Sequence, residues 1–133
     1  HADRKSILEG VPNQLPSLLR AHRLQEKASR VGFDWQEARQ VFRKVEEELA
    51  ELQAAIGEER SDRMEAELGD LLFSLVNLSR FITVNPEEAL RKTISKFIYR
   101  FRKIEEAAAE AGKSLNDMTL DEMERVWQEA KEK

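Results

Sequence analysis

Glycines and prolines are few in this chain of 133 residues, and they separate long segments in which apolar residues recur every three or four positions. The chain has five glycines and three prolines, and it lacks the alternating runs of β-branched residues that are typical of strands. Apolar residues at that spacing share one face of a helix. Helices are expected over residues 15–31, 35–56, 61–84, 86–111 and 119–131. The sequence therefore predicts an all-α fold, a helical bundle of four to five helices.

Small polar residues and glycines mark the expected ends of these helices. The expected starts are Asp34 with Glu37, Ser61 or Asp62, Asn85 with Pro86, and Thr119 with Glu122, and the expected stops are Gly32, Gly57 and Gly112. Residues 1–14 are interpreted as an irregular lead-in, a linker or tag remnant, because Gly10, Pro12 and Asn13 disfavour a helix. A single domain is expected over residues 15–133.

The composition argues against several classes of protein. Without cysteine the chain forms neither disulfides nor thiolate metal sites, which is compatible with a reducing cytoplasm. Acidic residues outnumber basic ones by 26 to 22, a balance that disfavours non-specific nucleic-acid binding. The longest apolar stretch, around residues 71–78, is far too short to span a bilayer, and no signal-peptide pattern opens the chain. The prediction is a soluble, cytoplasmic protein that binds neither nucleic acid nor membrane.

Five acidic residues interrupt the apolar surfaces of two consecutive expected helices: Glu47, Glu48, Glu51, Glu67 and Asp70. Glu48 falls inside an apolar stripe made of Val41, Val45, Leu52 and Ile56, and Glu51 lies at its edge. Glu67 and Asp70 belong to the only polar band of the next helix, which is otherwise apolar. A carboxylate is costly to bury unless it is paired or binds a metal, so the pattern indicates a site for a hard divalent cation.

The alternative interpretation of these acids is a solvated surface. Arg43, Lys44, Arg60 and Arg63 are close enough in sequence to neutralise some of the carboxylates. Spacing alone leaves the two interpretations about even, but Glu48, Glu67 and Asp70 can be exposed only if their apolar neighbours are exposed too.

The helix expected over residues 86–111 carries a basic line, Lys96, Arg100 and Lys103, beside an apolar stripe made of Leu90, Ile94, Phe97, Phe101 and Ile104. Cations beside metal-bound carboxylates suit a polyphosphate, whose oxygens accept hydrogen bonds from Arg and Lys. The alternative is a solvated basic face balanced by Glu105 and Glu106.

Aromatic residues have two interpretations as well. Trp127 and Lys131 are four positions apart on the last helix, where the ring either covers the core or stacks on a nucleobase while Lys131 reaches the phosphates. Phe33 and Trp35 are expected to pack at the start of a helix rather than to contact a ligand. No Glu-x-x-His pair, P-loop, dinucleotide-binding glycine motif or serine elbow is present in the sequence.

The acidic residues also carry a resemblance. Glu47-Glu48-Leu49-Ala50-Glu51 followed by Glu67-Leu68-Gly69-Asp70 is the EExxE…ExxD signature of the all-α nucleoside triphosphate pyrophosphohydrolases. The chain resembles the MazG family, most of all the second domain of a two-domain MazG. Further segments match that family in the same order: residues 31–35, 69–73, 76–78, 96–97, 100–102 and 124–127 with Lys131. The resemblance extends over about residues 15–131.

This resemblance implies a reaction and a set of residues. Family members hydrolyse a nucleoside triphosphate to the monophosphate and pyrophosphate with Mg²⁺, for which Mn²⁺ can substitute, and they assemble as homodimers or dimers of dimers. The matching Mg²⁺ ligands are Glu48, Glu51, Glu67 and Asp70, with Glu47 as a supporting or water-directing acid; Lys96 and Arg100 match triphosphate contacts, and Trp127 and Lys131 match nucleotide contacts. Broad base specificity and a role in nucleotide-pool housecleaning are expected.

Two other functions remain open at this point. One is a sister all-α enzyme that hydrolyses dUTP or phosphoribosyl-ATP. The other is a non-catalytic helical binding module, although such a scaffold would gain stability by replacing buried carboxylates with apolar residues.

Overall fold

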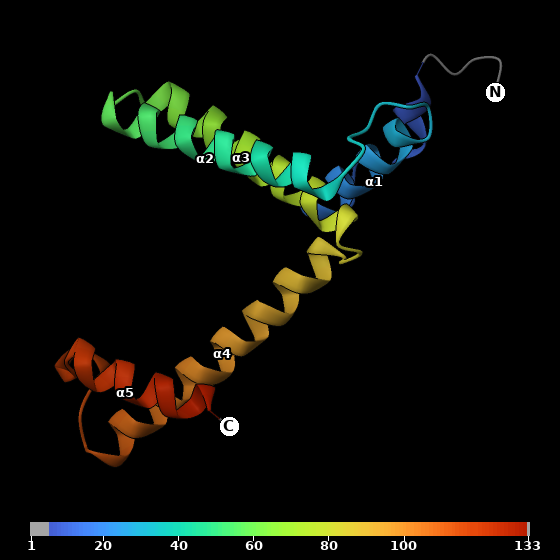
Figure 1. Ribbon diagram of the computed structural model, residues 1–133. Helices are drawn as coiled ribbons and strands as arrows, with labels where there is room; N and C mark the ends of the chain where they lie inside the picture. Colours follow the sequence, from blue (N-terminus) through green and yellow to red (C-terminus); the bar gives the residue numbers. More distant parts are fainter. Residues whose placement is uncertain (1–5, 133) are drawn as a thin grey trace. The chain divides into compact units, whose positions relative to one another are not determined.

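The computed structural model describes residues 6–132, and within them the chain is helical and has no strand (Figure 1). The elements are a 3₁₀ helix η1 (Ile7–Gly10), α1 (Ser17–Ser29), α2 (Ala38–Gly57), α3 (Ser61–Phe81), α4 (Pro86–Glu110), a 3₁₀ helix η2 (Leu115–Asp117) and α5 (Leu120–Lys131). The all-α prediction is confirmed. The lead-in is not wholly irregular, because the Ser6 hydroxyl accepts a hydrogen bond from the Leu8 N–H and caps η1; residues 1–5 lie outside the described residues.

Two of the expected helix starts are confirmed. The Thr119 hydroxyl accepts a hydrogen bond from the Glu122 N–H at 3.1 Å, and the Glu122 carboxylate accepts one from the Thr119 N–H at 3.0 Å. Before α4 the Asn85 side chain accepts from the Glu88 N–H at 3.1 Å. Gly32 and Gly112 have φ of 92° and 68°, the left-handed conformation that ends helices and that glycine adopts without strain.

The other expected starts are wrong. Helix α2 begins at Ala38 with Glu37 as N-cap, and the Gln40 side chain accepts from the Glu37 N–H at 3.1 Å, so Asp34 is not the N-cap. Asp34 binds Arg80 instead, as described below. Helix α3 follows Arg60 as N-cap, and neither Ser61 nor Asp62 is the cap.

Two compact units make up the chain, His1–Ala89 and Leu90–Lys133. In the first unit α2 and α3 run side by side as an antiparallel pair, while α1 packs against α3 and η1 (Figure 1). Val41 and Ala55 on α2 are fully buried, and Val76 on α3 is 2% exposed. Small side chains thus fill the tightest part of this packing, because they let two helix backbones approach closely.

Many large apolar side chains of α2 and α3 stay on the surface. Ile56 is 54% exposed, so its expected place in the buried stripe is wrong; Ala55, one residue earlier, faces the core instead. Leu68, Leu72, Phe73 and Leu75 on α3 are also exposed. Consecutive apolar residues point in different directions around a helix, and a single neighbouring helix covers only one of those directions.

The second unit contains most of α4, η2 and α5. Ile104 and Ala108 are its buried apolar residues, and the ring of Trp127 on α5 lies 5.5 Å from that of Phe97 on α4. Leu90, Ile94 and Phe97 are exposed, so Ile104 is the one fully buried member of the expected apolar stripe. Across residues 6–132, none of the helices has the length and apolar character needed to cross a membrane.

Candidate functional site

Three carboxylates from two helices meet in the first unit. Glu48 comes from α2, and Glu67 and Asp70 come from α3; one oxygen of each lies within 4.8 Å of one oxygen of the others. Glu48 is seven residues from both Val41 and Ala55, which are fully buried, so the same helix face that packs against α3 carries this carboxylate inward. On α3, Glu67 and Asp70 are three residues apart and therefore share a face.

Burial leaves part of this cluster without partners. The side chains of Glu48 and Glu67 are only 8% and 13% exposed. Within residues 6–132 the buried Oε2 atoms of both accept no hydrogen bond. Partial burial raises the pKa of Glu67, and the adjacent carboxyls of Glu51, Asp70 and Glu48 raise it further. The free protein therefore holds excess negative charge that a cation would stabilise.

Two basic residues neutralise part of this charge, as the solvated-surface interpretation expected. Lys44 Nζ lies 2.9 Å from Glu48 Oε1, and this contact raises the pKa of Lys44. Arg63 lies 3.7 Å from Glu67 Oε1 and makes a shorter contact, 2.7 Å, with Glu58. Glu48 and Glu67 thus each use one carboxylate oxygen for an ion pair, while the other oxygen accepts no hydrogen bond within residues 6–132. A set of carboxylate oxygens with bare buried lone pairs fits a hard divalent cation such as Mg²⁺.

The remaining predicted acids lie beside the three. Glu51 is outside the group of oxygens within 4.8 Å but lies next to Glu67, whose pKa it raises. Glu47 is largely exposed and sits 3.4 Å from Lys44 Nζ.

The predicted basic and aromatic residues belong to the second unit. The Arg100 guanidinium lies over the Trp127 ring, 5.4 Å from its centroid, and Lys96 is exposed one turn earlier on α4. Lys131 is exposed one turn after Trp127. Lys103 differs from its two neighbours in the basic line, because it pairs with Glu106 at 3.4 Å. The structure therefore brings Arg100 and Trp127 together, whereas Glu106 neutralises the charge of Lys103.

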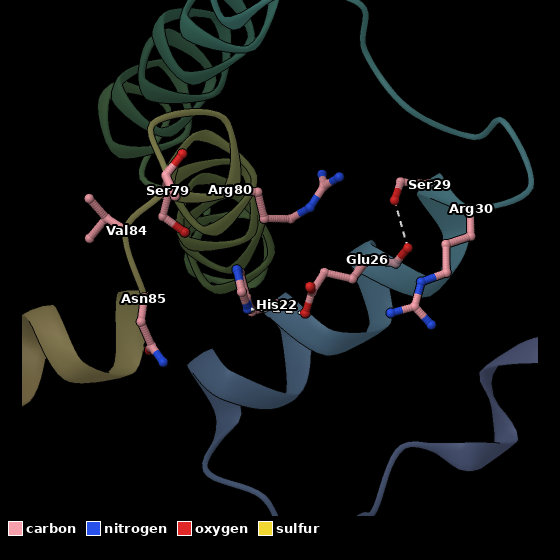
Figure 2. Close-up of a pocket in the computed structure, with 9 residues that line it drawn as sticks. His22, Glu26, Ser29, Arg30, Ser79, Arg80, Val84 and Asn85 are labelled. Atoms are coloured by element: carbon pink, nitrogen blue, oxygen red, sulfur yellow. Dashed lines mark hydrogen bonds and ion pairs between the residues drawn. The ribbon is translucent and has the colours of Figure 1, made fainter.

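A polar cavity of about 420 Å³ lies between α1 and the end of α3 (Figure 2). His22 and Glu26 of α1 line one side, with His22 Nδ1 3.5 Å from the Glu26 carboxylate, and Ser79 and Arg80 line the other. None of the residues predicted from the sequence for metal or nucleotide binding lines this cavity.

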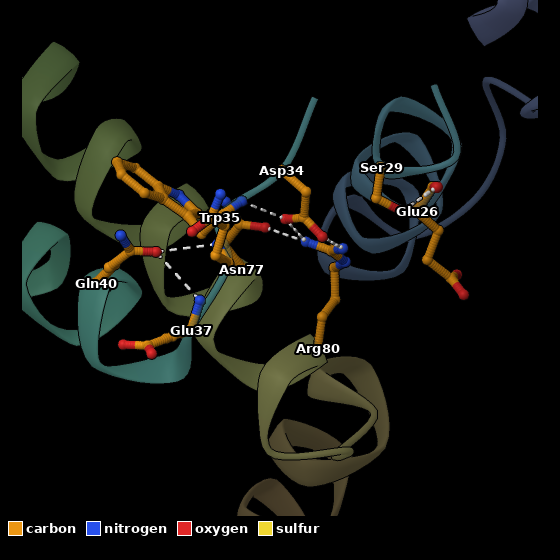
Figure 3. Close-up of polar contacts among 9 residues, drawn as sticks. Glu26, Ser29, Asp34, Trp35, Glu37, Gln40, Asn77 and Arg80 are labelled. Carbon is orange, nitrogen blue, oxygen red and sulfur yellow. Dashed lines mark hydrogen bonds and ion pairs between the residues drawn. The ribbon is translucent and has the colours of Figure 1, made fainter. Parts of the chain in front are cut away.

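A second group of contacts was missed by the sequence analysis. Asp34, in the segment before α2, binds Arg80 of α3, and Arg80 also donates to Asn77 at 2.5 Å (Figure 3). The hydrogen bond from Arg80 lowers the pKa of Asp34. Phe33, expected to pack at a helix start, is 82% exposed, so that prediction is wrong. No periodic signal could have paired residues this far apart in the sequence.

The comparison with protein families agrees with this geometry. The MazG nucleotide pyrophosphohydrolase domain matches residues 36–104, which include all the acids of the cluster. This chain belongs to the MazG family. The resemblance inferred from the acidic signature is confirmed.

Individual relatives match nearly the whole chain. The nucleoside triphosphate pyrophosphohydrolase/pyrophosphatase MazG of Thermotoga maritima is 46% identical over 129 residues, 96% of this chain and 49% of the relative. The nucleoside triphosphate pyrophosphohydrolase of Escherichia coli K12 is 40% identical over 128 residues, 95% of this chain and 49% of the relative. The uncharacterized protein YabN of Bacillus subtilis is 45% identical over 133 residues, 99% of this chain and 27% of the relative. The chain thus spans about half the length of the first two.

Proposed function

We propose that this chain hydrolyses nucleoside triphosphates to the monophosphate and pyrophosphate, with Mg²⁺ held by Glu48, Glu51, Glu67 and Asp70. The observation that carries the proposal is the group of three carboxylate oxygens within 4.8 Å, two of whose residues keep a bare buried oxygen. Membership of the MazG family supports it, as do the names of the relatives from Thermotoga maritima and Escherichia coli.

The reaction breaks the bond between the α-phosphorus and the oxygen that bridges to the β-phosphorus. Water supplies the new oxygen on the monophosphate, and pyrophosphate leaves. Mg²⁺, or Mn²⁺ in its place, would offset charge on the phosphoryl oxygens and lower the pKa of bound water. Glu47, whose carboxylate is exposed beside the cluster, is assigned to orienting the attacking water.

Residues of the second unit are assigned to the substrate. Lys96 and Arg100 bind the triphosphate and stabilise the leaving pyrophosphate by charge. Trp127, whose ring lies against the Arg100 guanidinium, is assigned to stacking on the nucleobase, and Lys131 is assigned to a further phosphate contact. None of these groups reads the edge of a base, which supports broad base specificity and a role in cleaning the cytoplasmic nucleotide pool.

We also propose that the chain forms a homodimer or a dimer of dimers. The support is the set of exposed leucines on α3, Leu68, Leu72 and Leu75, which α2 and α1 leave uncovered. Contiguous apolar surface of this kind is typical of protein–protein interfaces.

A panel of nucleoside triphosphates, including dUTP and phosphoribosyl-ATP, tests the reaction. Each is incubated with the chain and Mg²⁺, in ¹⁸O-labelled water, and the products are identified. We expect monophosphate carrying the label, together with pyrophosphate, for several bases. Diphosphate with inorganic phosphate would contradict the proposal, and turnover of a single substrate would assign the chain to a sister activity.

A further inference from the structure

The polar cavity between α1 and the end of α3 contains a pair of side chains that the proposed reaction does not use. His22 and Glu26 are four residues apart on α1, so they share one face of the helix, and Figure 2 shows them side by side at the cavity. The His22 side chain is 17% exposed and that of Glu26 is 40% exposed. The pair therefore combines a shielded imidazole with a carboxylate that solvent reaches.

The imidazole of His22 has a ring nitrogen without a hydrogen-bond partner. Its Nδ1 atom is buried and takes part in no hydrogen bond within residues 6–132. Oε1 of Glu26 lies 3.5 Å from this nitrogen, beyond the about 2.7–3.2 Å that is usual for an N–H···O hydrogen bond. A buried polar atom left in this state is costly, which indicates that a further group completes the pair.

The separation of the two atoms suits a metal ion between them. Zn²⁺ binds histidine nitrogen and carboxylate oxygen at about 2.0–2.2 Å, and two such ligands of a tetrahedral ion are about 3.3–3.5 Å apart. The 3.5 Å between His22 Nδ1 and Glu26 Oε1 agrees with this geometry without any movement of the helix. Imidazole is a ligand that favours Zn²⁺, Cu²⁺ and Ni²⁺, whereas Mg²⁺ prefers oxygen ligands.

Three arginines near the pair leave room for a cation. Arg80 lines the cavity, but its guanidinium already donates to both oxygens of Asp34. Arg30 also lines the cavity and is exposed, so solvent and salt screen its charge. Nε of Arg23 is 4.0 Å from Glu26 Oε1, and this side chain is 56% exposed. A metal would replace that contact at small cost, because exposed ion pairs contribute little.

We propose that His22 and Glu26 form a site for a transition-metal dication of the zinc class. The two side chains are the protein ligands, and water completes the coordination, for which a cavity of about 420 Å³ has space. The acids assigned to Mg²⁺ do not line this cavity, so the two metal sites are separate. A metal held by residues four apart also joins two successive turns of α1 and stabilises that helix.

Nitrogen NMR of the whole chain tests the ligand directly. The sequence has two histidines, His1 and His22, so a His1→Gln variant assigns their ring signals. Zn²⁺ is titrated in excess Mg²⁺, and we expect the Nδ1 signal of His22 to shift as the ion binds. A shift at His1 alone, or at neither histidine, would overturn the proposal without any change to the cavity.

Calorimetry with the same ion measures what each ligand contributes. We expect His22→Gln to weaken Zn²⁺ binding about 10-fold or more, at least the effect of losing an outer partner of a metal ligand. Glu26→Gln should also weaken it, whereas Glu129→Gln, at an exposed position of α5, should not. Circular dichroism checks that the variants stay helical. Zn²⁺ should raise the melting temperature of the wild type more than that of His22→Gln.

The Asp70→Asn variant separates this site from the acidic cluster. In that variant the shift of the His22 signal should persist, because Asp70 does not line the cavity. Loss of the shift in Asp70→Asn, or unchanged Zn²⁺ affinity in His22→Gln, would place the bound ion at the acidic cluster and overturn the proposal. Neither result would bear on nucleotide hydrolysis with Mg²⁺.

Discussion

Asp34 and Arg80 are 46 residues apart in the sequence and form a two-pronged ion pair, with Nη1 3.2 Å from Oδ1 and Nη2 2.9 Å from Oδ2. This ion pair connects the segment before α2 with the last turn of α3. Both side chains are mostly shielded from water, so this contact is stronger than an exposed ion pair.

The pair predicts how stability depends on pH. The hydrogen bond from Arg80 lowers the folded-state pKa of Asp34 below the ordinary 3.8, so its contribution is complete above that value and is lost as the pH falls through the folded-state pKa. Urea unfolding should show Asp34→Asn to be about 1 kcal/mol less stable than wild type near neutral pH, with the difference vanishing in acid. Arg39→Gln, which breaks an exposed pair, is the control. A difference that persists in acid would contradict the assignment.

Removing Asp70 tests the acidic cluster. Asp70 is exposed, so Asp70→Asn should keep the helical circular dichroism, lose Mg²⁺ binding by calorimetry and lower turnover by about 10²-fold or more. Without metal the variant should unfold at the same or a higher temperature, because one of several repelling charges is gone. Glu65→Gln, at another exposed position on α3, should change none of these quantities. Wild-type turnover in Asp70→Asn would exclude Asp70 as a metal ligand.

The basic residues of α4 should affect rate more than affinity. Lys96→Ala and Arg100→Ala are expected to lower kcat about 10²- to 10³-fold, the usual effect of losing an electrostatic stabiliser. Trp127→Ala should mainly raise KM, and Trp127→Phe should restore part of the loss by keeping a ring on which the base stacks. Normal kcat in both charge variants would remove Lys96 and Arg100 from the reaction.

Thr83 offers a prediction about stability alone. Its φ is 58°, in the left-handed region where a β-branched residue is strained and glycine is not. Thr83→Gly should therefore raise the free energy of unfolding by about 0.5–1 kcal/mol, measured by denaturant titration. Gly112→Ala, at φ 68°, should have the opposite sign. Destabilisation by Thr83→Gly would show that the threonine side chain outweighs the strain.

The exposed leucines of α3 predict self-association. Light scattering at micromolar concentration and physiological salt should give the mass of a dimer or tetramer, and Leu72→Lys should shift it toward monomer by placing a charge in the interface. Gln53→Lys, at an exposed polar position of α2, should leave the mass unchanged. A monomeric wild type would refute the assembly.

Helical periodicity predicted much of the fold and the inward position of Glu48, since that residue keeps the register of Val41 and Ala55. Helical periodicity predicts burial less reliably for residues at the edge of an apolar stripe. Ile56 is only one residue beyond Ala55, but that residue turns the side chain by about 100° and takes it out of the core.

The wrong prediction of Asp34 as the N-cap of α2 is explained by a contact between residues that are distant in the sequence. Asp34 with Glu37 and Glu37 with Gln40 are overlapping capping patterns, and local sequence does not choose between them. Arg80 decides the choice, because it engages the Asp34 carboxylate from another helix. The exposed position of Phe33 follows from the path of this same segment, which no local pattern encodes.

The full burial of Val41 and Ala55 on α2 has a consequence for the ion selectivity expected of the proposed metal site. Glu48 comes from one helix and its acidic neighbours from the other, so the gap between them is fixed by the hydrocarbon volume packed above and below. Mg²⁺ and Ca²⁺ differ by a few tenths of an ångström in ligand distance, about 2.0–2.1 Å against about 2.3–2.6 Å. A larger side chain at Ala55 would push α2 and α3 apart, so we expect the metal preference of the proposed site to depend on a residue that carries no ligand atom.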